Sequence, residues 1–236
     1  MDASRTSSLY SDTELENDTS GSNIYLSLGL KGRFNQNLGN PKVLSLLSSL
    51  LQKSIEKNET LLQTAQTKDI ITVFHGSRAP ALTIKQYIYR IFKYSRCSPS
   101  CFVVAHIYID RFLQSESIIL TSLNVHRLLI TSIMLATKFI DEAFFNNAYY
   151  AKVGGVTTSE LNRLEMKFLF GIDFRLYVDP STFGRYCSLL MSVASGEEVQ
   201  VERPLHVIQG ACGIKENWSK NSDDTSYPHT LGIHIK

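Results

Sequence analysis

Hydrophobic residues recur at helical spacing through the middle of the chain, whereas both ends are polar. The spacing is clearest after Thr83, where apolar side chains fall three and four positions apart, at Ile84, Tyr87, Ile88, Ile91 and Phe92. Thr83 and Gln86 also have the spacing of a capping box, which marks a helix start. Further start signals stand at Asn40-Pro41, Ser98-Pro99, Thr157 with Glu160, and Asp179-Pro180. Because no window predicts a strand hairpin, we expect an all-α fold.

The helix expected from about Ser122 to Ile140 differs from the others in its pattern. Its second half is apolar around nearly the whole circumference, through residues such as Leu135, Phe139 and Ile140. A helix that is apolar all round must be enclosed by other helices. We therefore predict five core helices with one of them buried at the centre, and one flanking helix at each end of this bundle.

Composition and periodicity divide the chain into four parts. Residues 1–40 and 195–236 are polar and lack periodicity, so we expect a disordered or loosely docked tail at each end. Residues 41–75 hold the N-terminal flanking helix, whose pattern is partly broken at Asn58, and a linker. Residues 76–194 hold the core helices and one helix that follows them.

The charge balance argues against several kinds of partner. Lys and Arg number 24 and Asp and Glu 22, which gives a formal net charge of +2 without any basic block. We therefore expect no binding to nucleic acid or to a membrane. The longest nearly uncharged apolar stretch, residues 128–136, is far shorter than the roughly 20 residues that span a bilayer. With 4 Cys and no signal-peptide pattern, an intracellular protein is expected, in the nucleus, the cytoplasm or both.

The sequence carries no phosphate-binding loop, nucleophile elbow or zinc-protease motif. Gly154-Gly155 has the composition of a phosphate-cradling turn, but a tight turn that needs positive φ explains the two glycines more simply. Cys97, Cys101 and His106 are the nearest approach to a metal site, but Cys101 and His106 lie about 140° apart on their predicted helix and no fourth ligand is near in sequence. Buried thiols are therefore expected instead. We expect no catalytic residue, no metal, no cofactor and no small-molecule substrate.

Two charged residues stand where the pattern predicts core. Lys138 lies in the central helix, and Glu165 lies on the apolar stripe of the helix that follows Thr157. An unpaired buried charge costs several kcal/mol, so the two residues are expected to pair with each other or to reach the rim. The other interpretation is that they mark an edge where a partner protein docks, and spacing leaves both open.

Four more charged residues lie beside apolar positions. Asp110 and Arg111 pose the same question, and for them we favour an internal salt bridge or a cap. The adjacent carboxylates of Asp141 and Glu142 are expected to lie in solvent rather than to form an acid–base pair.

Seven segments of the chain, in unbroken order, carry a family resemblance. They span residues 74–80, 97–103, 107–111, 123–131, 136–139, 146–156 and 160–165. Residues 76 to about 190 resemble a cyclin box, in particular that of the plant U-type (P-type) cyclins, which are relatives of the fungal phosphate-signalling cyclins. The stretch Asn-Asn-Ala-Tyr-Tyr-Ala-Lys-Val-Gly-Gly-Val at 146–156 is specific to this branch. A cyclin box has five helices with a buried third one, in agreement with the fold predicted above.

The resemblance implies a regulatory subunit that binds and activates a cyclin-dependent protein kinase, with an A-type plant kinase as the expected partner. In that family a Lys near the end of the third box helix and a Glu on the fifth contact the kinase, and these match Lys138 and Glu165. Four further residues are expected to support the fold: Asp110, Arg111, Gly154 and Gly155. The alternative is a cyclin-like module that binds nucleic acid or acts as a scaffold, and nucleic-acid binding would need a basic face.

The chain departs from the cell-cycle cyclins in several motifs. Residues 84–90 lack the Met-Arg-Ala-Ile-Leu sequence with which those cyclins dock substrates, and neither a destruction box nor a retinoblastoma-binding motif is present. Only one helix is expected after the box, so a second cyclin fold is not predicted. Cell-cycle control and nutrient, hormone or developmental signalling therefore both stay open as contexts.

Overall fold

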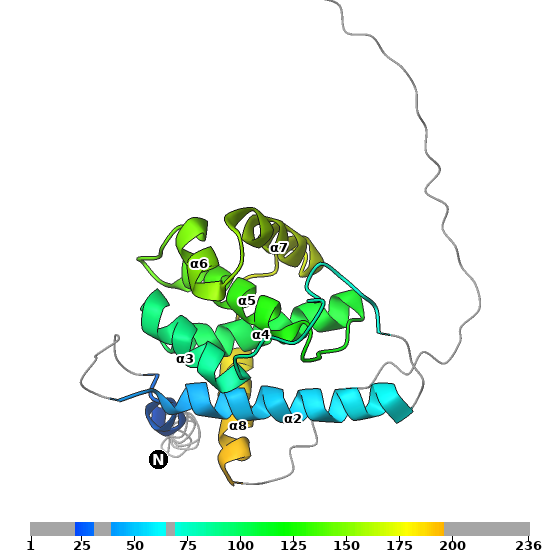
Figure 1. The fold of residues 1–236 in the computed structure, drawn as a ribbon. Helices are drawn as coiled ribbons and strands as arrows, with labels where there is room; N and C mark the ends of the chain where they lie inside the picture. The colour runs from blue at the N-terminus through cyan, green and yellow to red at the C-terminus, as the bar shows by residue number, and fades with distance from the viewer. Residues whose placement is uncertain (1–21, 31–38, 65–68, 196–236) are drawn as a thin grey trace, which may run out of the picture. The chain divides into compact units, whose positions relative to one another are not determined.

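The computed structural model describes residues 22–30, 39–64 and 69–195. Within them the secondary structure is entirely helical, which confirms the all-α prediction. Figure 1 shows the helices α2 (Lys42–Thr64), α3 (Ile84–Ser95), α4 (Ser100–Glu116), α5 (Val125–Ile140), α6 (Asn147–Gly154), α7 (Thr158–Gly171) and α8 (Pro180–Ser195). Residues 22–28 form a further helix ahead of α2. None of the helices in these ranges is long and apolar enough to cross a membrane.

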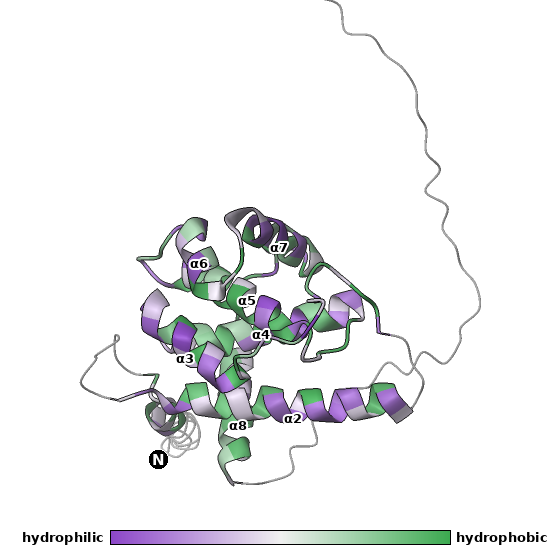
Figure 2. Ribbon diagram, in the orientation of Figure 1, coloured by the Kyte–Doolittle hydropathy of each residue, from purple (hydrophilic) through white to green (hydrophobic). Residues whose placement is uncertain are grey.

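Two neighbouring helices, α4 and α5, form the centre of the bundle (Figure 1). α5 contacts α3, α4, α6 and α7, and its residues 128–137 are all buried, which confirms the predicted central helix. α4 is similarly enclosed, because α2, α7 and α8 pack on its other sides. Figure 2 accordingly shows hydrophobic residues in the middle of the bundle and hydrophilic residues on the outer side of α7.

Both ends of α5 differ from the sequence prediction. Phe139 and Ile140, which the pattern assigns to the core, are exposed, so the enclosure of the helix ends before its C-terminus. The helix also begins at Val125 rather than near Ser122, because residues 122–124 form a turn. The hydrophobic pattern therefore extends beyond the buried part of the helix at its C-terminal end.

The N-terminal part of the chain carries more structure than its composition predicts. The tail expected over residues 1–40 contains the helix at residues 22–28, and its Leu28 side chain is fully buried. Tyr25 packs against Phe183 of α8, with ring centroids 5.8 Å apart. Of the two alternatives expected for this tail, disorder does not hold for residues 22–30, because a few apolar side chains can dock on a core that other helices supply. The tail predicted beyond residue 195 lies outside the described residues.

The start of α2 also differs slightly from the prediction. α2 begins at Lys42 rather than at Pro41, whose carbonyl accepts a backbone hydrogen bond from Leu44 at 3.2 Å. The apolar stripe is partly broken at Asn58, and the helix continues through this position to Thr64. A polar residue on this face is accommodated because the Asn58 side chain donates to a backbone carbonyl of the loop before α5 at 2.9 Å.

Three helix starts follow their sequence signals. Both hydrogen bonds of the capping box at Thr83 are present. The Thr157 side chain accepts the backbone N–H of Glu160, while the Glu160 carboxylate forms an ion pair with Arg127 at 2.6 Å. Asp179 caps α8, because its carboxylate accepts a backbone N–H at 2.8 Å. These caps satisfy donors that a helix terminus leaves without an intrahelical partner.

At two other helix ends, the residue that caps the helix is not the one that the sequence indicates. Ser98 does not cap α4 with its side chain, since the cap residue is Pro99. Gly171 follows the apolar stripe of α7 at a position that suits a C-terminal cap, but the cap residue is Ile172. A Cβ atom on Gly171 would lie 2.4 Å from the ring of Phe112, so close packing against α4 explains this glycine.

α6 ends in the turn predicted for the two adjacent glycines. Gly155 has a φ of 73°, and its N–H donates to the carbonyl of Ala151. A Cβ atom on Gly154 would lie 2.7 Å from Cγ1 of Ile130, so this residue lets α6 approach α5 closely. The carbonyl of Gly154 also accepts a hydrogen bond from the Tyr87 hydroxyl at 2.9 Å. The glycine pair therefore positions the end of α6 against α3 and α5.

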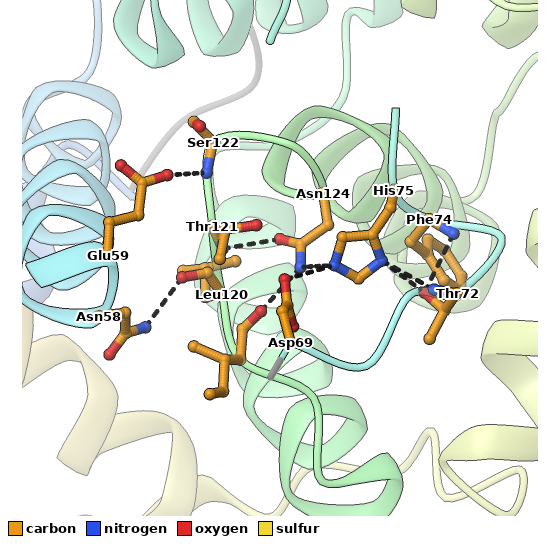
Figure 3. Close-up of polar contacts among 11 residues, drawn as sticks. Asn58, Glu59, Asp69, Thr72, Phe74, His75, Leu120, Thr121, Ser122 and Asn124 are labelled. Atoms are coloured by element: carbon orange, nitrogen blue, oxygen red, sulfur yellow. Dashed lines mark hydrogen bonds and ion pairs between the residues drawn. The ribbon is translucent and has the colours of Figure 1, made fainter. Parts of the chain in front are cut away.

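A partly buried polar network, which we call the linker cluster, joins Asp69, Thr72, His75 and Asn124 (Figure 3). At its centre the His75 side chain is only 2% exposed. Thr72 donates its backbone N–H to Nδ1 of His75 at 3.0 Å. Nε2 of the same ring lies 3.2 Å from a carboxylate oxygen of Asp69.

Asn124 completes the linker cluster from the cap position of α5. Its Oδ1 accepts the N–H of Thr121 at 3.0 Å, and its Nδ2 donates to the carbonyl of Ile119 at 2.8 Å. The same Nδ2 lies 3.1 Å from Nε2 of His75. Glu59 of α2 is tied to this loop as well, since it accepts a backbone N–H there at 2.8 Å (Figure 3). These bonds fix the point at which α5 begins.

Candidate functional site

The structure brings together the two charged residues that the sequence singled out. Lys138 lies in the last turn of α5 and Glu165 lies in the middle of α7. Lys138 Nζ is 2.6 Å from Glu165 Oε1, and the two side chains are 26% and 15% exposed. The pair therefore lies at the rim of the bundle, within reach of a partner, rather than deep in the core.

A third side chain, which sequence reasoning missed, bridges this pair. Asn147, the first residue of α6, accepts a hydrogen bond from Lys138 at 2.6 Å and donates one to Glu165 Oε2 at 2.6 Å. It also donates to Oδ1 of Asn162 at 2.8 Å. We call Lys138, Asn147, Asn162 and Glu165 the rim cluster. Each side chain in it is fixed by at least one other, so the charged groups are already oriented before any partner arrives.

The adjacent asparagines at the start of α6 divide two tasks between them. Asn146 is the cap residue, and its side chain accepts the backbone N–H of Tyr149 at 3.0 Å. Asn147 lies one position further on, so its amide is free to reach Lys138 and Glu165. The signal in the sequence is the doubled Asn at a helix start, because a single Asn suffices for a cap.

The rim cluster leaves hydrogen-bonding capacity unused. The ammonium group has three donors, of which Asn147 and Glu165 take two. Each carboxylate oxygen of Glu165 accepts one bond within the cluster and has a lone pair left. The arrangement can therefore give one N–H donor and a carboxylate acceptor to the main chain of another protein.

Exposed hydrophobic side chains flank the rim cluster along the chain. They lie at the end of α5, in the loop that follows it and on α7: Phe139, Ile140, Phe144, Phe145 and Met166. Large exposed apolar residues that surround a few polar anchors are typical of a protein–protein interface. These exposed hydrophobic side chains therefore agree with a role of the rim cluster in binding a protein.

Asp141, next to the rim cluster, is not simply a solvated carboxylate as the sequence suggested. Its Oδ2 accepts the backbone N–H of Ser98 at 2.9 Å and a bond from the Cys101 thiol at 3.4 Å. A hydrogen bond to Cys97, together with burial, raises the pKa of the Cys101 thiol, which therefore stays protonated. Asp141 thus ties the end of α5 to the start of α4. In the part of the chain that the structure describes, no group of His, Cys, Asp and Glu can hold a metal ion.

The two charged residues of α4 connect this helix to its neighbours. Asp110 accepts a hydrogen bond from the Tyr186 hydroxyl of α8 at 2.9 Å. Arg111 donates from Nη1 to the carbonyls of Arg175 and Tyr177 at 2.6 and 3.0 Å. Arg111 therefore caps carbonyls in the segment after α7, and Asp110 links α4 to α8 through a hydroxyl group.

Comparison with known proteins agrees with this architecture. The sequence model of the Cyclin family matches residues 39–176, a range that includes α2 and ends before α8. Cyclin-P3-1 of Oryza sativa subsp. japonica is 52% identical over 86% of this chain and 86% of its own length. Cyclin-U3-1 and Cyclin-U4-1 of Arabidopsis thaliana are 50% and 49% identical, over 86% and 72% of this chain and 91% and 85% of their own lengths. The chain therefore belongs to the cyclin family, in the branch of the plant P-type and U-type cyclins.

Proposed function

We propose that this cyclin is the regulatory subunit of a cyclin-dependent protein kinase, with an A-type plant kinase as its partner. The kinase docks on the rim cluster and on the hydrophobic residues that flank it. Cyclins are a regulatory class of proteins, and the kinase supplies the catalytic residues of the complex. The cellular context is cell-cycle control or nutrient and developmental signalling.

One observation carries this proposal. The ammonium of Lys138 and the carboxylate of Glu165 are held 2.6 Å apart at a partly exposed rim. These residues match the Lys and Glu with which cyclins bind main-chain groups near the C-helix of the kinase. An exposed ion pair contributes only about 0–1 kcal/mol to folding, so stability alone gives little reason for placing one here. A docking role explains both the position of the pair and the free donors and acceptors.

The mechanism follows from what kinases need for phosphoryl transfer. A strand Lys must pair with a Glu of the C-helix, and this helix has to lie inward for the pair to form. A surface that binds only the inward form shifts the equilibrium by its difference in affinity for the two forms. Moving a population from 1:99 to 99:1 takes about 5.5 kcal/mol. An interface of roughly 2,000 Å² with well-placed anchors can supply this difference.

The double variant Lys138→Ala with Glu165→Ala tests the proposal. We expect it to weaken binding to an A-type plant cyclin-dependent kinase by at least about thirtyfold, as loss of an anchor does. The matched control removes another surface ion pair, Lys167 with Glu116, which is 2.8 Å long and 43% and 25% exposed. Lys167 projects from α7 about 160° away from Glu165 around the helix axis, so this control should bind normally.

Calorimetry on purified proteins measures both affinities, and the helical circular-dichroism signal verifies that each variant is folded. Equal binding of the wild type and of the Lys138→Ala, Glu165→Ala variant would reject these two residues as anchors. Failure of the wild type to bind any A-type kinase would reject the choice of partner.

A further inference from the structure

A basic surface forms on α3 and on the end of α6. α3 and the residue that caps it contribute four exposed basic side chains: Lys85, Arg90, Lys93 and Arg96. At about 100° per residue, the four fall within an arc of about 140° on the solvent side of the helix. Between Thr83 and Ile109 the sequence contains no Asp or Glu, so no acidic neighbour along the chain offsets them.

α6 adds a fifth positive charge to the same surface. Arg90 donates from Nε to the carbonyl of Val153 at 2.8 Å and from Nη2 to the carbonyl of Lys152 at 3.3 Å. These bonds hold the end of α6 beside α3 and bring exposed Lys152 next to Arg90. We call the five residues Lys85, Arg90, Lys93, Arg96 and Lys152 the α3 basic face. Four of its members lie within residues 85–96, and only folding brings Lys152 beside them.

Unlike three other basic residues of the described chain, the members of the α3 basic face have no carboxylate partner there. Arg127, Lys138 and Lys167 each form an ion pair, at 2.6, 2.6 and 2.8 Å. By contrast, no carboxylate of residues 22–30, 39–64 or 69–195 forms an ion pair with any member of the face. The net charge of the chain is only +2, so this surface holds a local excess of positive charge.

An exposed aromatic side chain lies within the same surface. Tyr94 is 45% exposed, and Nζ of Lys93 lies 5.6 Å from the centroid of its ring. The Tyr94 carbonyl accepts a hydrogen bond from the Tyr149 hydroxyl of α6 at 2.9 Å, which fixes its backbone. Tyr and Arg are enriched among the residues that dominate binding energy at protein interfaces.

We propose that the α3 basic face binds an acidic, extended segment of a partner protein. From Lys85 to Arg96 the face spans about 16 Å along the helix, which matches about five residues of extended chain. The complementary charge is therefore a short run of Asp and Glu residues. The face lies at the end of α6 that carries Lys152, whereas the rim cluster uses Asn147 at the other end. This inference therefore does not depend on the proposed kinase binding.

A protein segment is favoured over nucleic acid as the occupant. Domains that bind nucleic acid by charge usually have an isoelectric point above about 9 and a long basic stripe. Here the sequence isoelectric point is about 8.3 and the face spans only about three turns of one helix. A short acidic segment matches this limited positive charge better than a long polyanion does.

The experiment measures binding of the full chain to a fluorescein-labelled peptide of alternating Glu and Ser by fluorescence polarisation. We expect saturable binding that weakens with rising salt, and no binding of the matching Gln–Ser peptide. The variant Lys85→Glu, Lys93→Glu, Arg96→Glu should lose affinity by about tenfold or more, since each exposed ion pair contributes roughly 1.5- to 5-fold. The three side chains are exposed, so the variant should retain the helical fold.

The matched control is Lys42→Glu, Lys53→Glu, Lys57→Glu, which changes three exposed residues of α2 and lowers the net charge equally. It should bind the acidic peptide within about twofold of the wild type, because its three residues do not belong to the α3 basic face. Equal losses in the two variants would overturn the proposal, since net charge alone would then explain binding.

Two other outcomes would also overturn it. One is tighter binding of a DNA or RNA duplex than of the acidic peptide, with the same dependence on the α3 residues. The other is binding of the peptide only after removal of residues 1–21. These residues include four carboxylates between Asp12 and Asp18, so this result would make the chain itself the occupant.

Discussion

The two polar networks of this cyclin lie at opposite ends of α5 and differ in how they use their hydrogen bonds. The linker cluster surrounds Asn124 at the start of the helix, and the rim cluster surrounds Lys138 at its end. Asn124 is fully buried and bonds to backbone groups of its own loop. Lys138 is partly exposed and bonds to side chains from α6 and α7.

The linker cluster therefore stabilises the fold, whereas the rim cluster orients charged groups at the surface. In the linker cluster, loss of one side chain leaves buried backbone donors and acceptors without partners, which destabilises the folded state. In the rim cluster, water can replace a lost partner, so folding changes little while the orientation of the charged groups changes. Asn124 is therefore expected to affect stability and Asn147 to affect binding, although the two side chains are chemically identical.

The largest effect is expected from Asn124→Ala. The substitution leaves the N–H of Thr121 and the carbonyl of Ile119 without their partner in the buried loop. The free energy of unfolding should fall by about 2–4 kcal/mol, as it does for buried groups that lose their hydrogen bonds. Urea denaturation followed by circular dichroism measures this change. If the free energy of unfolding falls by less than about 0.5 kcal/mol, the linker cluster does not stabilise the fold more than the rim cluster does.

The adjacent asparagines of α6 give an intermediate and more discriminating test. Asn147→Ala should weaken kinase binding by about five- to tenfold, because Lys138 and Glu165 lose the side chain that orients them. Asn146→Ala should instead lower the free energy of unfolding by about 1 kcal/mol, because it removes a helix cap.

Each asparagine variant is the control for the other, since the residues are identical in type and adjacent in sequence. Binding is measured by calorimetry and stability by urea denaturation. If both variants change the same quantity, the division of tasks between Asn146 and Asn147 is wrong.

The smallest effect is expected for the stability of the single variant Lys138→Ala. The ion pair is partly exposed, so the free energy of unfolding should change by less than about 1 kcal/mol. The same urea experiment detects this, with the wild type as reference. A loss above about 2 kcal/mol would mean that the pair serves the fold in the way that the linker cluster does.

Local spacing predicted much of the fold. The stripe after Thr83, its capping box and the apolar circumference of α5 depend on neighbours within two helical turns, and all three are present in the structure. Lys138 and Glu165 could also be identified from the sequence, because each is a charged residue at a position where the pattern predicts an apolar one. The family resemblance then indicated that the two residues belong to one site.

Contacts between distant parts of the chain were beyond such reasoning. Gly171 resembles a helix cap until the position of the Phe112 ring is known. Asn147 resembles part of a cap until α6 is placed between α5 and α7. The α3 basic face depends on Lys152, which only the packing of α6 against α3 brings near. In each case the cause is a tertiary contact, on which periodicity carries no information.

Leu28 has a practical consequence for anyone who shortens this protein. Its side chain is fully buried, although it precedes the range matched by the Cyclin family. A fragment trimmed to residue 39 would uncover the apolar socket that Leu28 fills and would leave Phe183 without its Tyr25 neighbour. Such fragments should aggregate more readily and be less soluble than fragments that retain residues 22–30. A fragment made for crystallisation should therefore begin before residue 22.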